Sequence, residues 1–315
     1  MKRIALIGEC MIELNGAPFG AMTQAFGGDS LNTAVYLARV AGEKVAIDYV
    51  SALGTDAISN GMLARWQQEG VSTDLVLRDE TRQPGLYLIQ LDEQGERTFL
   101  YWRNQSAARY MIQHADFVRI EAALTKVDMV YLSGISLAIL PAEDRTKLVA
   151  LLASLRQQGV EVAFDSNYRP ALWRDADEAR RCYRQVFEIT DLALVTNDDE
   201  ANLWGDSDEQ ATLNRLQAAG VKKVVVKMGA KGNLYQEFTA DSIADEAETI
   251  ATTLVQTVVD TTSAGDSFNA GFLAGYLQGK DAQQCSRQGH QLAGIVIQHK
   301  GAIIAKQLTD MFRFV

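Results

Sequence analysis

The segment Asp260–Gly271 combines small residues with carboxylates in a spacing that suits phosphate chemistry. It follows a run rich in β-branched residues, Thr252–Val259, and precedes an apolar run, Phe272–Leu277, so we expect a strand, a tight turn and a helix. The unpaired N–H groups and partial positive charge of the first helical turn would bind an anion such as phosphate. Asp266 would lie inside that turn, where its carboxylate could accept a proton from a hydroxyl. This pattern predicts phosphoryl transfer to an alcohol, although a capped helix after a buried strand would give the same local sequence.

The composition is that of a globular α/β protein. With 315 residues, 47% hydrophobic and 22% charged, the chain can form one large domain or two ordinary ones. A net charge of −10 argues against nucleic-acid binding but leaves a small anionic substrate open, because arginines can be placed locally. The three cysteines, Cys10, Cys182 and Cys285, contain no CxxC pair and predict reduced thiols in the cytoplasm. No signal peptide or membrane-spanning apolar stretch is visible, so we expect no membrane association.

Short apolar runs alternate with helical patterns along most of the chain. The expected core strands are residues 4–7, 45–53, 129–135, 160–165, 192–196 and 221–227. Repeated strand–helix units predict an α/β fold with a mostly parallel central sheet and helices on both faces. Polar or glycine-rich clusters follow the ends of these strands, at the edge where open α/β sheets bind ligands.

Residues 84–103 interrupt this alternation with a hairpin pattern. Pro84–Leu91 and Arg97–Arg103 are alternating runs on either side of Asp92–Glu96. Because an isolated hairpin is marginally stable, we expect strands from residues 11–26 to complete a small sheet, which would act as a lid. The predicted division is a main α/β domain over residues 1–10, 27–80 and 105–315 and a discontinuous lid over residues 11–26 and 81–104.

Three motifs resemble the signatures of PfkB/ribokinase-type carbohydrate kinases, and they occur in the same order. Gly27–Ala34 resembles the Gly-Gly…Asn-x-Ala signature, Asn197–Glu200 the Asn-x-x-Glu motif, and Asp260–Asp266 the Asp-Thr-Thr-Gly-Ala-Gly-Asp signature. The likeness extends over nearly the whole chain, and three ordered motifs are more specific than one. It implies a ribokinase-like fold with a β-sheet lid. Ser263 departs from the family, which usually has glycine there; the role belongs to backbone N–H groups, so function should survive if Ser263 adopts the turn.

The resemblance implies ATP-dependent phosphoryl transfer with Asp266 as the catalytic base. The backbone N–H groups of Ala264, Gly265 and Asp266 would form the anion hole for the developing charge. Members of the family often respond to K⁺ through residues near Asp260 and Thr262, and the sequence leaves open whether this protein does.

Asn197 and Glu200 would face the phosphates or Mg²⁺ and its waters, with Glu200 as the metal contact, directly or through water. An acidic helix N-terminus would explain the same residues without a metal. By resemblance, the nucleotide would contact Asn167, Asn197, Lys227, Gly229, Ala230, Gly232, Ser263, Ala264 and Gly265.

Two arginines suggest the class of substrate. Arg103 ends a lid strand and Arg169 follows a core strand. Two guanidinium groups in one cleft would be costly near a neutral sugar without an anionic partner, whereas a carboxylate accepts charge-assisted and often bidentate bonds from them. The pair therefore favours a sugar acid; alternatively, Arg103 faces solvent and Arg169 only forms a salt bridge. Tyr87 and Tyr101 could bond sugar hydroxyls or simply pack in the sheet.

Further segments, among them Gly8–Leu14, Tyr101–Asn104 and Asn167–Trp173, are similar to those of the 2-keto-3-deoxygluconate kinases of this family. This likeness implies phosphorylation of the 6-hydroxyl of 2-dehydro-3-deoxy-D-gluconate to give 2-dehydro-3-deoxy-6-phospho-D-gluconate. By the same resemblance, the substrate would contact Gly27, Gly28, Asp29, Asn32, Tyr87, Tyr101, Arg103, Arg169 and Asp266.

Three other functions are compatible with parts of the pattern. A PfkB-type kinase of fructose or ribose would share the transfer motifs. A dinucleotide-dependent oxidoreductase is disfavoured because Gly8-Glu9-Cys10 lacks the second glycine of GxGxxG. A non-catalytic sugar-binding regulator is disfavoured by the presence of Asp266 and Glu200. The exposed edges of the lid also lead us to expect a homodimer that forms through it.

Overall fold

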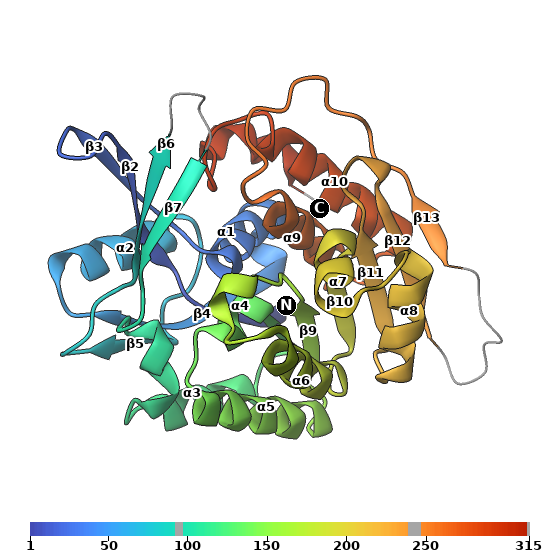
Figure 1. The fold of residues 1–315 in the computed structure, drawn as a ribbon, viewed down its shortest axis with the longest axis horizontal. Coiled ribbons are helices and arrows are strands. Elements are labelled where there is room, and N and C mark those ends of the chain that lie inside the picture. Colours follow the sequence, from blue (N-terminus) through green and yellow to red (C-terminus); the bar gives the residue numbers. More distant parts are fainter. Residues whose placement is uncertain (92–96, 239–246, 314–315) are drawn as a thin grey trace.

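Two sheets of different size organise the chain in the computed structural model, which describes residues 1–91, 97–238 and 247–313 (Figure 1). Within these ranges the large sheet has nine strands in the order β13-β12-β11-β10-β9-β8-β1-β4-β5. They are β1 (Lys2–Ile7), β4 (Val45–Gly54), β5 (Val76–Asp79), β8 (Met129–Ser133), β9 (Glu161–Asp165), β10 (Leu192–Thr196), β11 (Lys223–Lys227), β12 (Asn233–Glu237) and β13 (Glu248–Ile250). All neighbours run parallel except β12, which is antiparallel to both β11 and β13. The expected mostly parallel sheet is confirmed.

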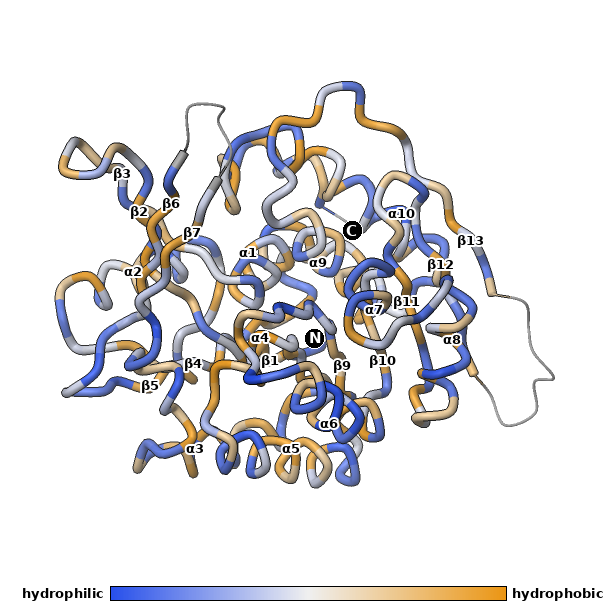
Figure 2. The backbone as a smooth tube through the Cα atoms, viewed as in Figure 1, coloured by the Kyte–Doolittle hydropathy of each residue, from blue (hydrophilic) through white to orange (hydrophobic). Residues whose placement is uncertain are grey.

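Helices cover both faces of this sheet. They are α1 (Asp29–Ala41), α2 (Ala57–Gln68), α3 (Phe117–Leu124), α4 (Gly134–Ala138), α5 (Ala142–Gln157), α6 (Ala176–Phe187), α7 (Asn197–Trp204), α8 (Glu209–Ala218), α9 (Ala264–Tyr276) and α10 (Ala282–Val296). Alternate strand residues feed two separate cores: Ile4 and Leu6 pack with α1, α9 and α10, whereas Ala5 and Ile7 pack with α3, α5 and α6. Figure 2 shows the hydrophobic residues along the central strands between these layers. No helix in the described ranges is long and apolar enough to cross a membrane.

The small sheet has four strands in the order β3-β2-β6-β7 within the described residues, and Figure 1 shows it standing apart from the large sheet on the side of α2. Its strands are β2 (Met11–Gly16), β3 (Met22–Gly27), β6 (Leu86–Leu91) and β7 (Arg97–Trp102). The β6–β7 pairing is antiparallel with Tyr87 opposite Tyr101, which confirms the expected hairpin and its completion by residues 11–26. The expected turn at Asp92–Glu96 lies outside the described residues.

The prediction of a strand at Thr252–Val259 is wrong. The chain leaves the large sheet at the end of β13 and runs as an irregular, mostly exposed loop to the start of α9. The N–H groups of Val259 and Asp260 donate to the carbonyl of Ile297, just after α10, at 2.8 and 3.2 Å instead of to a strand. β-Branched residues favour a strand only where a neighbouring strand can pair with them, and here none does within the described residues.

The strand expected at residues 129–135 ends at Ser133. Ser133 and Ser136 form a reciprocal capping box, so α4 begins at Gly134. A Cβ atom at Gly134 would lie 2.1 Å from the carbonyl oxygen of Ser166, so the chain turns here against the end of β9.

Candidate active site

A cleft of about 970 Å³ opens at the carboxyl ends of the parallel strands and is lined by residues of both sheets. This is the edge at which ligand binding was expected. The lining includes the predicted residues Gly27, Gly28, Asp29, Asn32, Tyr87, Tyr101, Arg103, Asn167, Arg169, Lys227, Gly229, Ala230, Gly232, Ser263, Ala264, Gly265 and Asp266. The two predicted residues outside this lining are Asn197 and Glu200.

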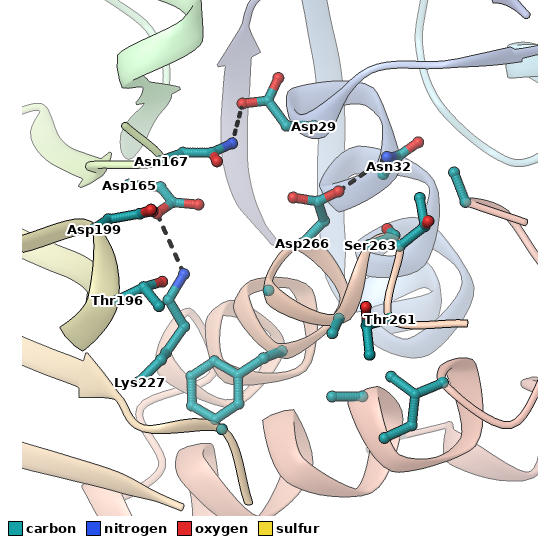
Figure 3. Close-up of a pocket in the computed structure, with 18 of the residues that line it drawn as sticks. Asp29, Asn32, Asp165, Asn167, Thr196, Asp199, Lys227, Thr261, Ser263 and Asp266 are labelled. Atoms are coloured by element: carbon teal, nitrogen blue, oxygen red, sulfur yellow. Dashed lines mark hydrogen bonds and ion pairs between the residues drawn. The ribbon is translucent and has the colours of Figure 1, made fainter. Parts of the chain in front are cut away.

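Asp266 lies in the first turn of α9 and lines the cleft. Its Oδ2 accepts a hydrogen bond of 2.9 Å from Asn32 Nδ2, which Figure 3 draws as a dashed line. Burial is the main cause that raises the pKa of Asp266 to about 7, and the carboxylates of Asp29 and Asp165 add to the rise. A carboxylate whose pKa lies near neutrality has the property that general bases require at physiological pH.

The turn before α9 presents backbone donors to the cleft. Ser263 has the left-handed conformation, with φ 66° and ψ 14°, so it does adopt the turn at which glycine was expected. The N–H of Ala264 donates to the carbonyl of Thr261 at 3.1 Å, which engages one of the three expected donors. In the part of the chain that the structure describes, the N–H groups of Gly265 and Asp266 have no such partner. The first turn of α9 therefore offers two free donors to an anion.

The N-terminus of α1 faces the same space. A Cβ atom at Gly28 would lie 2.1 Å from the carbonyl oxygen of Glu9, so only glycine allows the chain to enter α1 so close to that strand end. Asp29 follows in the first turn, and its Oδ2 accepts a hydrogen bond of 2.7 Å from Asn167 Nδ2 (Figure 3). In this structure Asn167, expected at the nucleotide, is thus bonded to a residue expected at the substrate.

Arg103 follows β7, where the chain returns from the small sheet to the main body. Its side chain is 10% exposed and forms an ion pair with Glu9, which also accepts a hydrogen bond from the Ser106 hydroxyl. The alternative that Arg103 faces solvent is therefore wrong. The premise that its guanidinium lacks an anionic partner is also wrong, because Glu9 supplies one. Its Nε is buried without a hydrogen-bond partner among the described residues.

Arg169 differs from Arg103 in its exposure. Its side chain is 52% exposed, lines the cleft and lies 3.4 Å from a carboxylate oxygen of Asp199. Tyr101 is 53% exposed, whereas Tyr87 is buried and its hydroxyl donates to the carboxylate of Glu13. Both arginines and both tyrosines thus reach the cleft, but only Arg169 and Tyr101 present largely open side chains.

Glu200 lies behind the cleft wall. Its carboxylate accepts a bond of 2.6 Å from Arg215 Nη2, and Arg215 also pairs with Asp206. Burial raises the pKa of Glu200 to about 7 against the opposing effect of Arg215. Its Oε1 is buried without a hydrogen-bond partner among the described residues. In those same residues no group of three or more His, Cys, Asp or Glu side chains is placed to hold a metal ion.

The far side of the cleft has the features of a nucleotide site. Gly229 and Gly232 flank a short turn after β11, and a Cβ atom at Gly232, where φ is 96°, would lie 2.1 Å from the carbonyl oxygen of Ile250. The lining also includes a group of apolar residues, Leu254, Val255, Val258, Phe268 and Ile297. An apolar wall beside exposed backbone suits a flat base with attached phosphates.

The charged or polar residues missed in the sequence include three that support the site. Glu9, Asp165 and Asn269 are buried and hold other site residues in place. Asp165 ends a strand, Glu9 follows one, and Asn269 lies three residues after Asp266. The position of each in the sequence could therefore have marked it as a candidate. Their partners are up to 138 residues away in the chain, which no local pattern can specify.

Substitution of Ser263 tests the left-handed turn. We expect Ser263→Gly to keep activity and a free energy of unfolding within about 1 kcal/mol of the parent, because glycine adopts this conformation without strain. Ser263→Val should lower the free energy of unfolding by about 1–3 kcal/mol and reduce turnover, since a β-branched residue disfavours φ > 0. Urea denaturation and a coupled ADP-release assay measure the two effects. Equal stability and turnover of the two variants would contradict the turn as described.

The chain is similar to known proteins in both sequence and fold. The family model described as pfkB family carbohydrate kinase matches residues 1–309. A curated 2-dehydro-3-deoxygluconokinase of Haemophilus influenzae is 57% identical over 97% of this chain and 96% of its own length. The 2-dehydro-3-deoxygluconokinase of Dickeya dadantii is 48% identical over 96% of this chain and 97% of its own.

Among solved structures, a PfkB protein from Polaromonas sp. JS666 superimposes with a TM-score of 0.82 at 25% identity, covering 98% of this chain and 99% of that one. The matches extend over both sheets, and the expected ribokinase-like fold is thereby confirmed. The chain belongs to the pfkB family of carbohydrate kinases.

Proposed function

We propose that the protein is a cytoplasmic ATP-dependent kinase that phosphorylates the 6-hydroxyl of 2-dehydro-3-deoxy-D-gluconate. The observation that carries this proposal is the nearly full-length identity, 57% and 48%, to two proteins that are 2-dehydro-3-deoxygluconokinases. Support from the site is the cleft that brings Arg103 and Arg169 to the same space as Asp266. The three cysteines are buried and free, in keeping with a reducing compartment.

The proposed reaction is an in-line transfer at the first turn of α9. The Asp266 carboxylate takes the proton of the attacking hydroxyl as its oxygen bonds to the γ-phosphorus of ATP. The bond from that phosphorus to the β–γ bridging oxygen breaks, and ADP leaves. The N–H groups of Gly265 and Asp266 would donate to the oxygens of the transferred group, where charge develops.

The carboxylate end of the substrate would lie toward the small sheet. There Arg169 and Tyr101 are open to the cleft, and the buried Arg103 has an unpartnered Nε. Asp29 and Asn32 would bind substrate hydroxyls from α1. By this proposal, the main body is one domain, and the small sheet is a second, discontinuous domain that acts as a lid over the cleft.

Mg²⁺ would enter with the phosphates of ATP and neutralise part of their charge when bound. Asp198 and Asp199 line the cleft, while Glu200 would act through a water, since Arg215 occupies its other carboxylate oxygen. A sparse set of carboxylates fits Mg²⁺, which keeps several of its waters. We also propose that K⁺ affects the activity through the loop that contains Asp260. The carboxylate of Asp260 accepts a hydrogen bond from the N–H of Gly301.

One observation favours a different substrate. Arg103 and Arg169 already have carboxylate partners, Glu9 and Asp199, so the protein balances their charge without a substrate carboxylate. A kinase of a neutral sugar such as fructose or ribose is therefore the second candidate.

An ADP-release assay with 2-dehydro-3-deoxygluconate, fructose and ribose, run on the parent and on Arg103→Ala, separates the two candidates. We expect the parent to prefer the sugar acid and Arg103→Ala to lose about 100-fold in kcat/KM for it, because a charge-assisted bond contributes about 1.5–3 kcal/mol. Arg174→Ala is the control, since Arg174 is exposed and outside the cleft. Preference for fructose or ribose, or full activity of Arg103→Ala on the sugar acid, would contradict the proposed substrate.

The pH dependence of kcat/KM tests Asp266 as the base. Because the base must be ionised and burial raises its pKa to about 7, kcat/KM should fall about tenfold per pH unit below pH 7 and level off above it. Asp266→Asn should lose nearly all turnover but still bind ATP, measured by isothermal titration. Turnover close to that of the parent in Asp266→Asn would exclude this residue as the base.

We also propose a homodimer that forms through the small sheet. Its edge strands are β3 and β7, and Met22, Phe99, Leu100 and Trp102 on these strands are at least 38% exposed. Light scattering should give about twice the monomer mass, and truncation of these side chains to Ser should shift it toward the monomer. A monomer at all concentrations would refute the dimer.

A further inference from the structure

Lys227, which was expected to contact the nucleotide, is bonded to other side chains of the protein in this structure. Its side chain is 9% exposed, and its Nζ donates to Asp165 Oδ1 at 3.2 Å and to Asn269 Oδ1 at 3.1 Å. Asn269 Nδ2 in turn donates to Asp165 Oδ2 at 2.8 Å and to the Tyr131 hydroxyl at 3.1 Å. The four side chains come from β11, β9, α9 and β8, so the network joins three neighbouring parts of the sheet to one helix.

The network holds the Lys227 ammonium under the first turn of α9. A Cβ atom at Gly265 would lie 3.6 Å from Lys227 Nζ. Asn269 is three residues after Asp266, one helical turn along α9, so it anchors that turn from below. Figure 3 shows the Lys227 side chain reaching Asp165, with Asp266 across the same space.

The charges around Asp266 are unevenly distributed. The titratable groups that face it are Asp29 and Tyr36 from α1, Tyr131 from β8 and Asp165 from β9. Lys227 from β11 ends beside Gly265, the residue before Asp266. Asp29 and Asp165 oppose ionisation of Asp266, and Lys227 is the positive group bonded to one of them. Asp199, from α7, is the other carboxylate that faces Lys227.

We propose that Lys227 is a positioning residue for the proton transfer: Asp165 and Asn269 hold its ammonium under α9, where it cancels the charge of Asp165 and keeps Asp266 ionised. The inference rests on Asp266 as the proposed base. It assigns Asp165, Lys227 and Asn269 to one unit that acts on Asp266, and it removes Lys227 from direct contact with ATP phosphate.

Plotted against pH, kcat/KM should fall on the acidic side, and we call this fall the acidic limb. Removing the positive charge or the negative charge of this unit should move the limb in opposite directions. In Lys227→Met, Asp165 is left uncompensated, so the limb should move to higher pH by about one unit. In Asp165→Asn, Lys227 is left uncompensated, so the limb should move to lower pH. The double variant Lys227→Met/Asp165→Asn should return to within about half a unit of the parent, because the two charges are removed together.

Three further measurements decide between this role and others. Thermal melts of each variant report folding, and Asp165→Asn carries the test alone if Lys227→Met does not fold. A merely structural role would lower kcat at every pH and leave the limb unmoved, which would overturn the proposal. A more than tenfold loss of ATP affinity in Lys227→Met, with an unmoved limb, would overturn it in favour of a direct phosphate contact.

The base assignment and this inference fail separately. If Asp266→Asn is inactive and the limbs do not move, only the role of Lys227 is wrong. If Asp266→Asn stays active, the assignment of the base is itself wrong, whatever the limbs do.

Discussion

The structure of the site is constrained by the electrostatic repulsion among several carboxylates at one edge of a sheet. Asp29, Asp165 and Asp266 line a single cleft; the charge of Asp165 opposes ionisation of Asp29 and Asp266, and the charge of Asp29 opposes that of Asp266. The fold offsets this repulsion with Lys227 and the amides of Asn32, Asn167 and Asn269, each of which donates to one of these carboxylates. Breaking a buried pair costs far more than the pair contributes, so the network demands that all its members be present.

The same charges lie where two helices of the cleft meet. α1 and α9 pack directly on each other, and both direct their N-termini at the cleft. Partial positive charge at two helix N-termini favours anions, both the carboxylates of the protein and a phosphate ligand. The missing side chain at Gly28 allows α1 to begin there, and the left-handed conformation of Ser263 does the same for α9.

The junction between the sheets is held by a second buried charge cluster. Glu9 follows β1 just before the chain enters the small sheet, and Arg103 and Ser106 lie just after it leaves. Their mutual bonds tie the two crossings of the chain together. Arg103 is therefore positioned by the main body while it faces the side of the cleft that the small sheet covers.

Local signals predicted most of the fold because its elements follow from hydrophobic periodicity and turn residues. Six strands of the large sheet (β1, β4 and β8–β11), the small sheet and the helix after Asp260 were predicted in this way. The strands β5, β12 and β13 were not predicted, and the pairing of Tyr87 with Tyr101 became known only from the structure. The strand expected at Thr252–Val259 failed because β-propensity cannot tell whether a partner strand is present. The expected three-donor anion hole changed because the Thr261 carbonyl engages the N–H of Ala264.

The sequence by itself determined the family, because ordered motifs and residue types are local properties. Only the tertiary structure decided which charges meet. It paired Arg103 with Glu9, Arg169 with Asp199, Glu200 with Arg215 and Lys227 with Asp165. Each such pair joins residues from different elements, and its free energy depends on distance and burial in the folded chain, which residue order does not encode.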